Sequence, residues 1–235
     1  MAGGTVFAHG KRPIGSPRIG FVTGAGDYKE RTADVKKIVI VDYGLGNLRS
    51  VVRGLENAGA TAVITSDPFE IAGAEAIVLP GVGAFHEGMA QLGPLQKTVR
   101  DAVRGIPLLG ICLGMQMLMD TSEEHGAHRG LGLIPGQVKK FPPIPGMKVP
   151  HMGWNSICIE RPDNPLFEGF ATEEYVYFVH SYYADTTPEF TLTSTTYIHP
   201  FASSICNNNA YGVQFHPEKS GEVGKRMLKN FINMV

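Results

Sequence analysis

Residues 106–119, Ile-Pro-Leu-Leu-Gly-Ile-Cys-Leu-Gly-Met-Gln-Met-Leu-Met, join an apolar strand-like run to a helical run through a glycine-flanked cysteine. Gly110 and Gly114 surround Cys112 in the G-x-nucleophile-x-G pattern, where small residues allow a tight turn that presents one side chain above a sheet. Such a turn places Cys112 at a helix N-terminus, where free amides and the helix dipole favour the thiolate. The stretch therefore predicts a nucleophilic cysteine at a strand-to-helix junction.

Apolar runs on the N-terminal side predict further strands of the same sheet. The runs that are typical of buried parallel strands are residues 38–41, 62–64 and 76–79. Helical spacing separates them at 47–58, with Gly59 placed to end the helix, and returns at 94–104. Because strands alternate with helices, we predict an α/β fold with a mostly parallel central sheet flanked by helices.

The pattern changes after about Leu131, where several prolines interrupt the chain and shorter strand-like segments follow. These segments are residues 156–159, 175–179, 191–195, 203–206 and 211–215. Their short spacing favours an added antiparallel portion, and the helical spacing at 221–234 predicts a last helix. We expect one domain over residues 37–235 and interpret the Gly-rich, basic residues 1–36 as a flexible extension without chemistry.

Composition excludes several functional classes. The chain has 235 residues, of which 43% are hydrophobic, so it is long enough to bury a core of its own. With 21 Lys and Arg against 22 Asp and Glu, its formal charge of −1 does not favour a nucleic-acid partner. No apolar run approaches the roughly 20 residues of a membrane helix, and residues 1–36 lack the apolar stretch of a secretory signal. We therefore expect a cytoplasmic protein with neither a nucleic acid nor a membrane as partner.

The three cysteines predict neither a disulfide framework nor a metal site. Three cannot all pair, and none shows the paired spacing of zinc ligands. Cys158 and Cys206 lie in strand-like segments with apolar neighbours, which predicts that they pack in the core. Cys112 alone is expected to be reactive, and neither a metal nor another cofactor is implied.

A proton carrier for this cysteine is offered by Gln-Phe-His-Pro-Glu at residues 214–218. In an extended chain, His216 and Glu218 point to the same side, so Glu218 could hold one imidazole nitrogen while the other faces the thiol. Since the ends of parallel strands gather at one edge of an α/β sheet, this pair is expected near Cys112. Cys112, His216 and Glu218 form the predicted catalytic set.

Pro-Gly-Val-Gly-Ala at residues 80–84 ends another predicted strand. Its two glycines let the backbone turn amides outward, so a developing oxyanion could be held by the amides of Val82 and Leu113. An ordinary glycine turn is the alternative. Residues 42–47, Asp-Tyr-Gly-Leu-Gly-Asn, do not predict a dinucleotide site, because Arg49 occupies the place of the third glycine.

With these motifs, residues 37–235 resemble the class I (triad) glutamine amidotransferases. The stretches that carry the resemblance are residues 80–83, 110–116 and 214–218. Within that class the sequence is most similar to the glutaminase subunits of imidazole glycerol phosphate synthase. The stretches that carry this finer resemblance are residues 42–47, 150–155, 178–182 and 218–221.

The resemblance implies that Cys112 attacks the side-chain amide of glutamine while His216, oriented by Glu218, moves the protons. It also implies a glutamine-binding set, which is Gly83, Gln116, Glu124, His180, Ser181 and Tyr182. For two of these a simpler interpretation stays open, since Gln116 could lie on a solvated helix face and Glu124 could be a solvated loop charge.

The resemblance further implies a heterodimer with a (β/α)8-barrel cyclase subunit that receives the ammonia and forms imidazole glycerol phosphate and aminoimidazole carboxamide ribotide. Trp154, the only tryptophan, follows Gly153 in an expected Pro-containing loop and is a candidate anchor of that interface, with Tyr177 as a second. A core position for Trp154 is the alternative.

Three other functions stay open at this point: the glutaminase subunit of another biosynthetic pathway, a non-catalytic binding module of the same fold, and a thiol hydrolase or peptidase with the same turn. The complete set of Cys112, His216 and Glu218 disfavours the binding module, and residues 150–155 disfavour the hydrolase.

Overall fold

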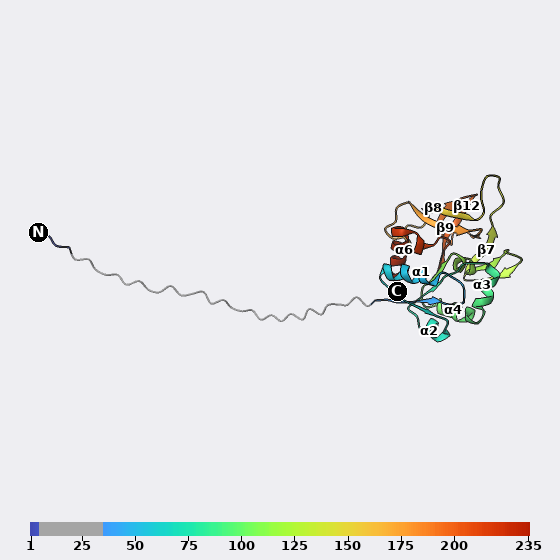
Figure 1. The fold of residues 1–235 in the computed structure, drawn as a ribbon, viewed down its shortest axis with the longest axis horizontal. Helices are drawn as coiled ribbons and strands as arrows, with labels where there is room; N and C mark the ends of the chain where they lie inside the picture. The colour runs from blue at the N-terminus through green and yellow to red at the C-terminus, as the bar shows by residue number, and fades with distance from the viewer. Residues whose placement is uncertain (5–34) are drawn as a thin grey trace. The chain divides into compact units, whose positions relative to one another are not determined.

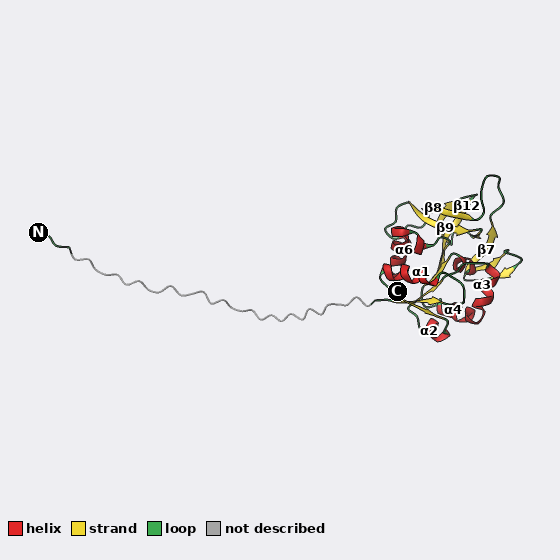
Figure 2. Cartoon of the chain, viewed as in Figure 1, coloured by secondary structure: helices red, strands yellow, loops and turns green. Residues whose placement is uncertain are grey.

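The computed structural model describes residues 1–4 and 35–235, and residues 35–235 lie within one compact unit. Residues 1–4 are exposed and carry no helix or strand. Most of the predicted extension, residues 5–34, lies outside the described residues, so its flexibility stays a prediction. Figure 1 shows the path of the compact unit in chain order, and Figure 2 shows its helices and strands.

The parallel part of the sheet has the order β2-β1-β3-β4-β13, and every neighbouring pair in it is parallel. Its strands are β1 (Lys37–Val41), β2 (Thr61–Thr65), β3 (Ala76–Leu79), β4 (Leu108–Ile111) and β13 (Ala210–Val213). The helices between them are α1 (Leu48–Ala58), α2 (Pro68–Ala72), α3 (Phe85–Leu92), α4 (Gln96–Ala102) and α5 (Leu113–Met117), with a 3-10 turn, η1, at Gly93–Leu95. From β1 to β4 the chain therefore alternates strands and helices as predicted, whereas β13 joins the parallel strands only after the antiparallel portion.

Strand β1 shows why helices cover both faces of this part. Ile38 and Ile40 pack in an apolar cluster that includes residues of α1 and α6 (Gly221–Asn233), and Figure 1 shows these two helices side by side. Val39 and Val41 pack in a second cluster that includes residues of α3, α4 and α5. Because successive side chains of a strand point to opposite faces, an apolar run such as β1 needs apolar partners on both.

The mostly antiparallel portion continues the sheet from β13 through β12, β10 and β7 to β5 and β6, with β11, β8 and β9 branching from β12. One pair in it, β5 with β7, is parallel. Its strands are β5 (Met119–Ser122), β6 (His128–Arg129), β7 (Ile134–Lys140), β8 (His151–Ile159), β9 (Glu173–His180), β10 (Tyr182–Asp185), β11 (Thr191–Thr196) and β12 (Pro200–Asn207). Two more 3-10 turns are η2 (Pro165–Phe167) and η3 (Pro217–Lys219). The predicted combination of a parallel sheet with an added antiparallel portion is confirmed, although β5, β6, β7 and β10 were not predicted.

Several local predictions are corrected by the structure. Strand β2 is only partly buried, because it lies at the edge of the sheet with a single neighbour. Trp154 lies in strand β8 rather than in a loop, and its 57% exposure excludes a core position. Cys158 is exposed and Cys206 is half-buried, so core packing is wrong for Cys158. Its strand β8 alternates exposed and buried residues, and Cys158 follows the fully buried Ile157.

Strands β4 and β13 bring the two ends of the predicted site together. They pair in parallel, with Gly110 opposite Gly212 and Ile111 opposite Val213, although β13 follows β4 by about a hundred residues in the chain. The amide of Cys112 donates to the carbonyl of Val213 at 2.8 Å, which extends the pairing one residue past β4. The carboxyl ends of these strands therefore place Cys112 and the segment after Val213 at the same edge.

A substitution at Gly114 tests the close packing of the segment after β4 against strand β3. A β-carbon on Gly114 would lie 1.8 Å from the carbonyl oxygen of Leu79 on the neighbouring strand, so Gly114→Ala forces backbone apart. We expect it to lower the free energy of unfolding by about 3 kcal/mol, measured by urea denaturation. As a matched control, Gly93→Ala meets open space and a right-handed helical backbone, and should stay within about 0.5 kcal/mol of the parent. Equal losses in the two variants would contradict this account of the turn.

Candidate active site

Cys112 occupies a strained turn between β4 and α5. Its backbone has a φ of +54° and a ψ of −106°, which a residue with a β-carbon rarely adopts. The turn closes tightly, since a β-carbon on Gly110 would lie 2.7 Å from the backbone of Gly114 and Met115. The glycines on both sides of the cysteine are therefore required by sterics, and the side chain of Cys112 is left 7% exposed at the floor of a pocket.

His216 and Glu218 form a buried pair. The imidazole Nδ1 of His216 lies 2.8 Å from Oε1 of Glu218. They do not lie along an extended strand as predicted, because β13 ends at Val213 and Glu218 lies in the 3-10 turn η3, with His216 as its N-cap. Pro217 is the first residue of that turn, so the same two-residue spacing brings the side chains together by a bend.

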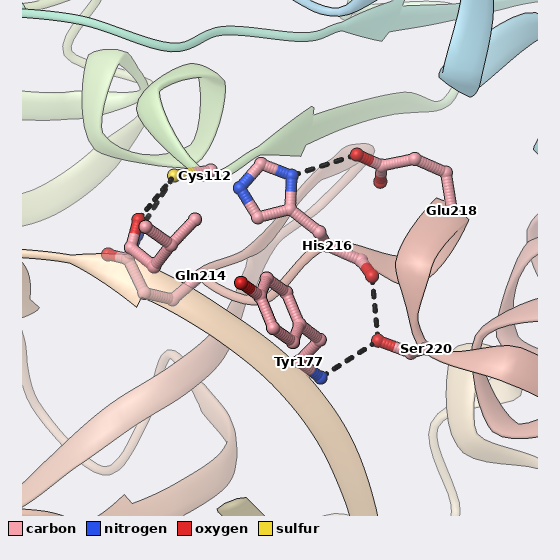
Figure 3. Close-up of polar contacts among 7 residues, drawn as sticks. Cys112, Tyr177, Gln214, His216, Glu218 and Ser220 are labelled. Carbon is pink, nitrogen blue, oxygen red and sulfur yellow. Dashed lines mark hydrogen bonds and ion pairs between the residues drawn. The ribbon is translucent and has the colours of Figure 1, made fainter. Parts of the chain in front are cut away.

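The free nitrogen of the imidazole, Nε2, points toward Cys112 (Figure 3). Burial opposes a charge on the ring, but the neighbouring Cys112 and Glu218 outweigh it and raise the pKa of His216 to about 9. A raised pKa means that the ring holds its proton near neutral pH when the sulfur beside it is a thiolate. The second carboxylate oxygen of Glu218, Oε2, is buried without a partner among the described residues.

The segment that carries His216 is fixed by the backbone of strand β9. The amide of His216 donates to the carbonyl of Tyr177 at 2.9 Å. In return the amide of Tyr177 donates to Oγ of Ser220, and this hydroxyl donates to the carbonyl of His216 at 2.6 Å (Figure 3). Ser220 is 1% exposed, so it forms a buried brace between β9 and the segment that carries His216.

The sulfur of Cys112 contacts two further groups. It donates to the carbonyl of Val179 at 3.9 Å and accepts a hydrogen bond from Nε2 of Gln214 at 3.6 Å (Figure 3). Gln214 is fully buried, and sequence reasoning did not assign it a role. Its position two residues before His216 was the available signal, since residues two apart in an extended segment share a side.

A pocket of about 340 Å³ opens over the sulfur. Its lining contains every residue of the predicted glutamine-binding set, which is Gly83, Gln116, Glu124, His180, Ser181 and Tyr182, and also Val82, Cys112, Leu113, Pro150, Val179 and His216. Glu218 is not part of the lining and contacts the pocket through His216. The structure thus brings the predicted residues together around one cavity.

Two open alternatives for this set are wrong. Gln116 is 5% exposed, and its amide donates to the carbonyl of Tyr182 and to Oε1 of Gln214, so it does not lie on a solvated helix face. Glu124 is 8% exposed and accepts a hydrogen bond from the amide of Phe85 at 2.6 Å, so it is not a solvated loop charge.

Val82 and Leu113 both line the pocket. Leu113 is the first residue of α5, so its amide has no acceptor within the helix. The glycines around Val82 differ: Gly83 has a φ of +106° in open space, whereas a β-carbon on Gly81 would lie 2.5 Å from the hydroxyl of Tyr43. Backbone freedom beside the pocket therefore resides at Gly83, and Gly81 is needed for close packing.

Strands β8 and β9 carry an exposed aromatic surface. Trp154 and Tyr177 are cross-strand partners whose ring centroids lie 6.3 Å apart in an edge-on arrangement. Met152 and Tyr175 are 63% and 59% exposed on the same strands. We call these four residues the β8–β9 surface.

Within the described ranges no group of three or more His, Cys, Asp or Glu is arranged to hold a metal ion. Over the same ranges the structure contains no helix that is both long enough and apolar enough to span a membrane.

Comparison with known proteins agrees with this architecture. The family model for class-I glutamine amidotransferases matches residues 39–235. The fold is similar to a structure of PurLQS from Thermotoga maritima, with a TM-score of 0.65 at 20% identity over 85% of this chain and 99% of that one. It is also similar to the glutaminase domain of a Trypanosoma brucei CTPS with bound acivicin, with a TM-score of 0.61 at 16% identity over 85% and 94%. The chain belongs to the class-I glutamine amidotransferases.

Curated relatives narrow the class. The chain is 52% identical to the imidazole glycerol phosphate synthase subunit HisH of Methanosarcina barkeri, over 85% of this chain and all of that protein. It is 51% identical to HisH of Natronomonas pharaonis, over 88% and 97%, and 48% identical to HisH of Syntrophotalea carbinolica, over 84% and 100%. Within the class, the chain therefore belongs to the HisH family.

The pairing of His216 with Glu218 yields a test by titration. Glu218→Gln removes the carboxylate charge that helps hold the proton on His216, so the pKa of the ring should fall from about 9 by at least about one unit. NMR titration of the His216 ring measures this directly. Glu222→Gln, on the exposed face of α6, is the matched control and should leave the value unchanged. An unaltered titration in Glu218→Gln would mean that the carboxylate does not support the charged ring.

Proposed function

We propose that this chain is the glutaminase subunit of imidazole glycerol phosphate synthase, which hydrolyses glutamine to glutamate and ammonia for a cyclase subunit in histidine biosynthesis. The observation that carries the proposal is the convergence of Cys112, His216 and Glu218 beside one pocket, in a chain about 50% identical to HisH subunits over nearly their whole length.

The chemistry begins with the sulfur. His216 holds the proton of the Cys112 thiol, and the thiolate attacks the side-chain amide carbon of glutamine to give a tetrahedral intermediate. The negative oxygen that develops there is stabilised by the amides of Leu113 and Val82. The proton on His216 passes to the nitrogen, the C–N bond breaks, and ammonia leaves a thioester on Cys112.

Water completes the cycle. His216 takes a proton from the water that attacks the thioester, and the second tetrahedral intermediate collapses with release of glutamate and return of the proton to the sulfur. Glu218 keeps the imidazole in one orientation and stabilises its charged form, at a distance of 2.8 Å. No step requires a cofactor or a metal.

The pocket residues explain how glutamine is held. In this proposal Gln116 and Glu124 bind the substrate's polar groups, while Gly83, Ser181 and Tyr182 shape the wall, and His180 closes the side toward β8. A volume of about 340 Å³ suits a substrate of the size of an amino acid. Glu124 is already aimed by the amide of Phe85, so its free oxygen can face the cationic amino group of glutamine.

Ammonia that escapes to neutral water becomes ammonium and loses its nucleophilicity, so the product needs a docked acceptor. The proposed acceptor is a (β/α)8-barrel cyclase, and the proposed docking site is the β8–β9 surface, where Met152, Trp154 and Tyr175 are exposed in the isolated chain. Since its cysteines are free, we propose that the complex works in the reducing cytoplasm.

The oxyanion site links the partner to activity. In this proposal the Gly81–Val82 peptide rotates before the amide of Val82 reaches the oxyanion, and the positive φ of Gly83 provides the freedom next to it. The isolated chain is therefore a weak glutaminase that the cyclase and its ligand stimulate.

The proposal is tested by glutamate release. We expect slow release by the purified chain, at least tenfold faster release when the barrel cyclase and its ligand are added (about 1.4 kcal/mol in activation free energy), and none with Cys112→Ser. Cys112→Ser should still co-purify with the cyclase, which separates loss of chemistry from loss of assembly. Equal turnover with and without the cyclase, or activity in Cys112→Ser, overturns the proposal.

A second prediction concerns the affinity of the chain for the cyclase. Trp154→Ala should weaken binding to the cyclase by about 2 kcal/mol, or roughly thirtyfold in Kd, because buried tryptophans often dominate docking energy. Isothermal titration calorimetry measures the change. Phe69→Ala, which removes a side chain that is 88% exposed on α2, should bind as the parent does. Parental affinity in Trp154→Ala would exclude Trp154 as an anchor.

A further inference from the structure

A chain of hydrogen-bonded side chains ends at the sulfur of Cys112. Its last member is Gln214, whose Nε2 donates to Sγ of Cys112 at 3.6 Å. Because the side chain of Gln214 is fully buried, water cannot replace this donor. The sulfur is thus flanked by the imidazole of His216 and by one fixed amide donor.

Gln116 fixes the orientation of that amide. Its Nε2 donates to Oε1 of Gln214 at 3.1 Å and to the carbonyl of Tyr182 at 3.0 Å. The carbonyl of Tyr182 and Oε1 of Gln214 are both acceptors, so the amide oxygen of Gln116 cannot replace its nitrogen there. If the amide of Gln214 turned its oxygen toward the sulfur, it would lose the hydrogen bond from Gln116. The amide N–H of Gln214 is therefore held toward Cys112.

The chain continues to strand β8. Nδ1 of His180 donates to the same carbonyl of Tyr182 at 2.8 Å, which makes Nε2 of His180 the acceptor for Nδ1 of His151 at 2.9 Å. Nε2 of His151 then accepts from the amide of Asn155 at 3.2 Å. Each neutral ring has one donor and one acceptor, so only one assignment of protons satisfies every contact.

Both rings are uncharged near neutral pH. Burial lowers the pKa of His151 to about 4 and that of His180 to about 3. The two residues are cross-strand partners of β8 and β9 and are 3% and 5% exposed. The chain therefore runs from Asn155, the neighbour of Trp154 in β8, to the sulfur without a charged member.

We propose that Gln214 is a further catalytic residue, whose amide stabilises the Cys112 thiolate, and that Gln116, His180, His151 and Asn155 are positioning residues that hold it. The proposal rests on the glutaminase function proposed above, since it concerns the same nucleophile. A thiolate needs donors, whereas the carbonyl of Val179, 3.9 Å away, suits only the protonated thiol. Gln214 is the donor besides His216 that offsets this preference.

The other groups around the sulfur set the background for a pH measurement. His216, with Glu218 behind it, favours the thiolate from η3. Burial and the nearby Cys112 raise the pKa of Tyr43, and Glu124 lines the same pocket. These groups are unchanged when only the amide of Gln214 is replaced, so a shift in the variant reports the lost donor.

The test is alkylation of Cys112 in the full chain by iodoacetamide between pH 5 and 10, with the Cys112 peptide quantified by mass spectrometry. Gln214→Met keeps the length of the side chain and removes the donor. Its alkylation profile should shift to higher pH by about one unit, and kcat for glutamine in the cyclase complex should fall roughly tenfold with KM within about twofold. An unshifted profile, or a change confined to KM, overturns the assignment.

Two further variants protect the result against misfolding. Gln214→Asn retains an amide that is too short to reach, and His151→Phe retains a ring among Phe178 and Tyr197 but removes the donor to His180. Both should shift the alkylation profile in the same direction, His151→Phe by less. Thr193→Val removes an equally buried hydrogen-bonding group in β11 and should shift nothing. A shift in Thr193→Val as large as that of Gln214→Met also overturns the proposal.

The alkylation assay needs neither glutamine nor the cyclase. A chain that shows the Gln214-dependent shift but releases no glutamate with the cyclase would overturn the proposed function and leave the thiolate assignment intact. Glutamate release together with an unshifted alkylation profile would support the proposed function and overturn the thiolate assignment.

Discussion

The parallel pairing of β4 with β13 is the constraint on which the site depends. It joins segments about a hundred residues apart, and it places the turn that holds Cys112 beside the segment that holds His216. A parallel pair cannot form by a short hairpin, so the whole antiparallel portion is the connection between these two strands. The added strands are thus the means by which one edge of the sheet receives both Cys112 and His216, the proposed nucleophile and base. They also carry the surface that is proposed to meet the partner.

Around that pairing, most of the precision of the site comes from backbone contacts. Ser220 bridges the carbonyl of His216 and the amide of Tyr177, and the amide of Cys112 is bound to Val213. These backbone groups belong to regular strands or to the turns directly after them. The sheet therefore fixes the positions of the Cys112 and His216 side chains. Strand β9 contributes twice, since it braces the segment of His216 and supplies His180 to the pocket wall. The proposed docking surface is on the outer face of the same strand, so docking and chemistry share one element.

Much of this could be read from the sequence, and the failures have physical reasons. The parallel strands were predictable because each is a continuous apolar run. The tight turn at Cys112 was predictable because glycines lie on both sides of the cysteine. Strand β8 was placed too late and Trp154 was assigned to a loop, since Pro150 and Gly153 resemble turn residues although β8 begins at His151. Cys158 is exposed because side chains alternate along the strand and Ile157 takes the buried position. The prediction was wrong because it took the apolar neighbour as a sign that Cys158 is buried too. Strands such as β6, with two residues, carry no periodic pattern, and the role of Gln214 depends on a partner about a hundred positions away.

The carboxylate of Glu218, with only one of its oxygens hydrogen-bonded within the part of the chain that the structure describes, lowers the free energy of unfolding. One oxygen binds His216, but the other is buried without a partner among the described residues, in surroundings where an unmet polar atom lowers stability. An apolar side chain of similar volume would suit this position better as a piece of folded protein. At this residue the proposed contribution of the carboxylate to turnover is therefore opposed to the stability of the fold.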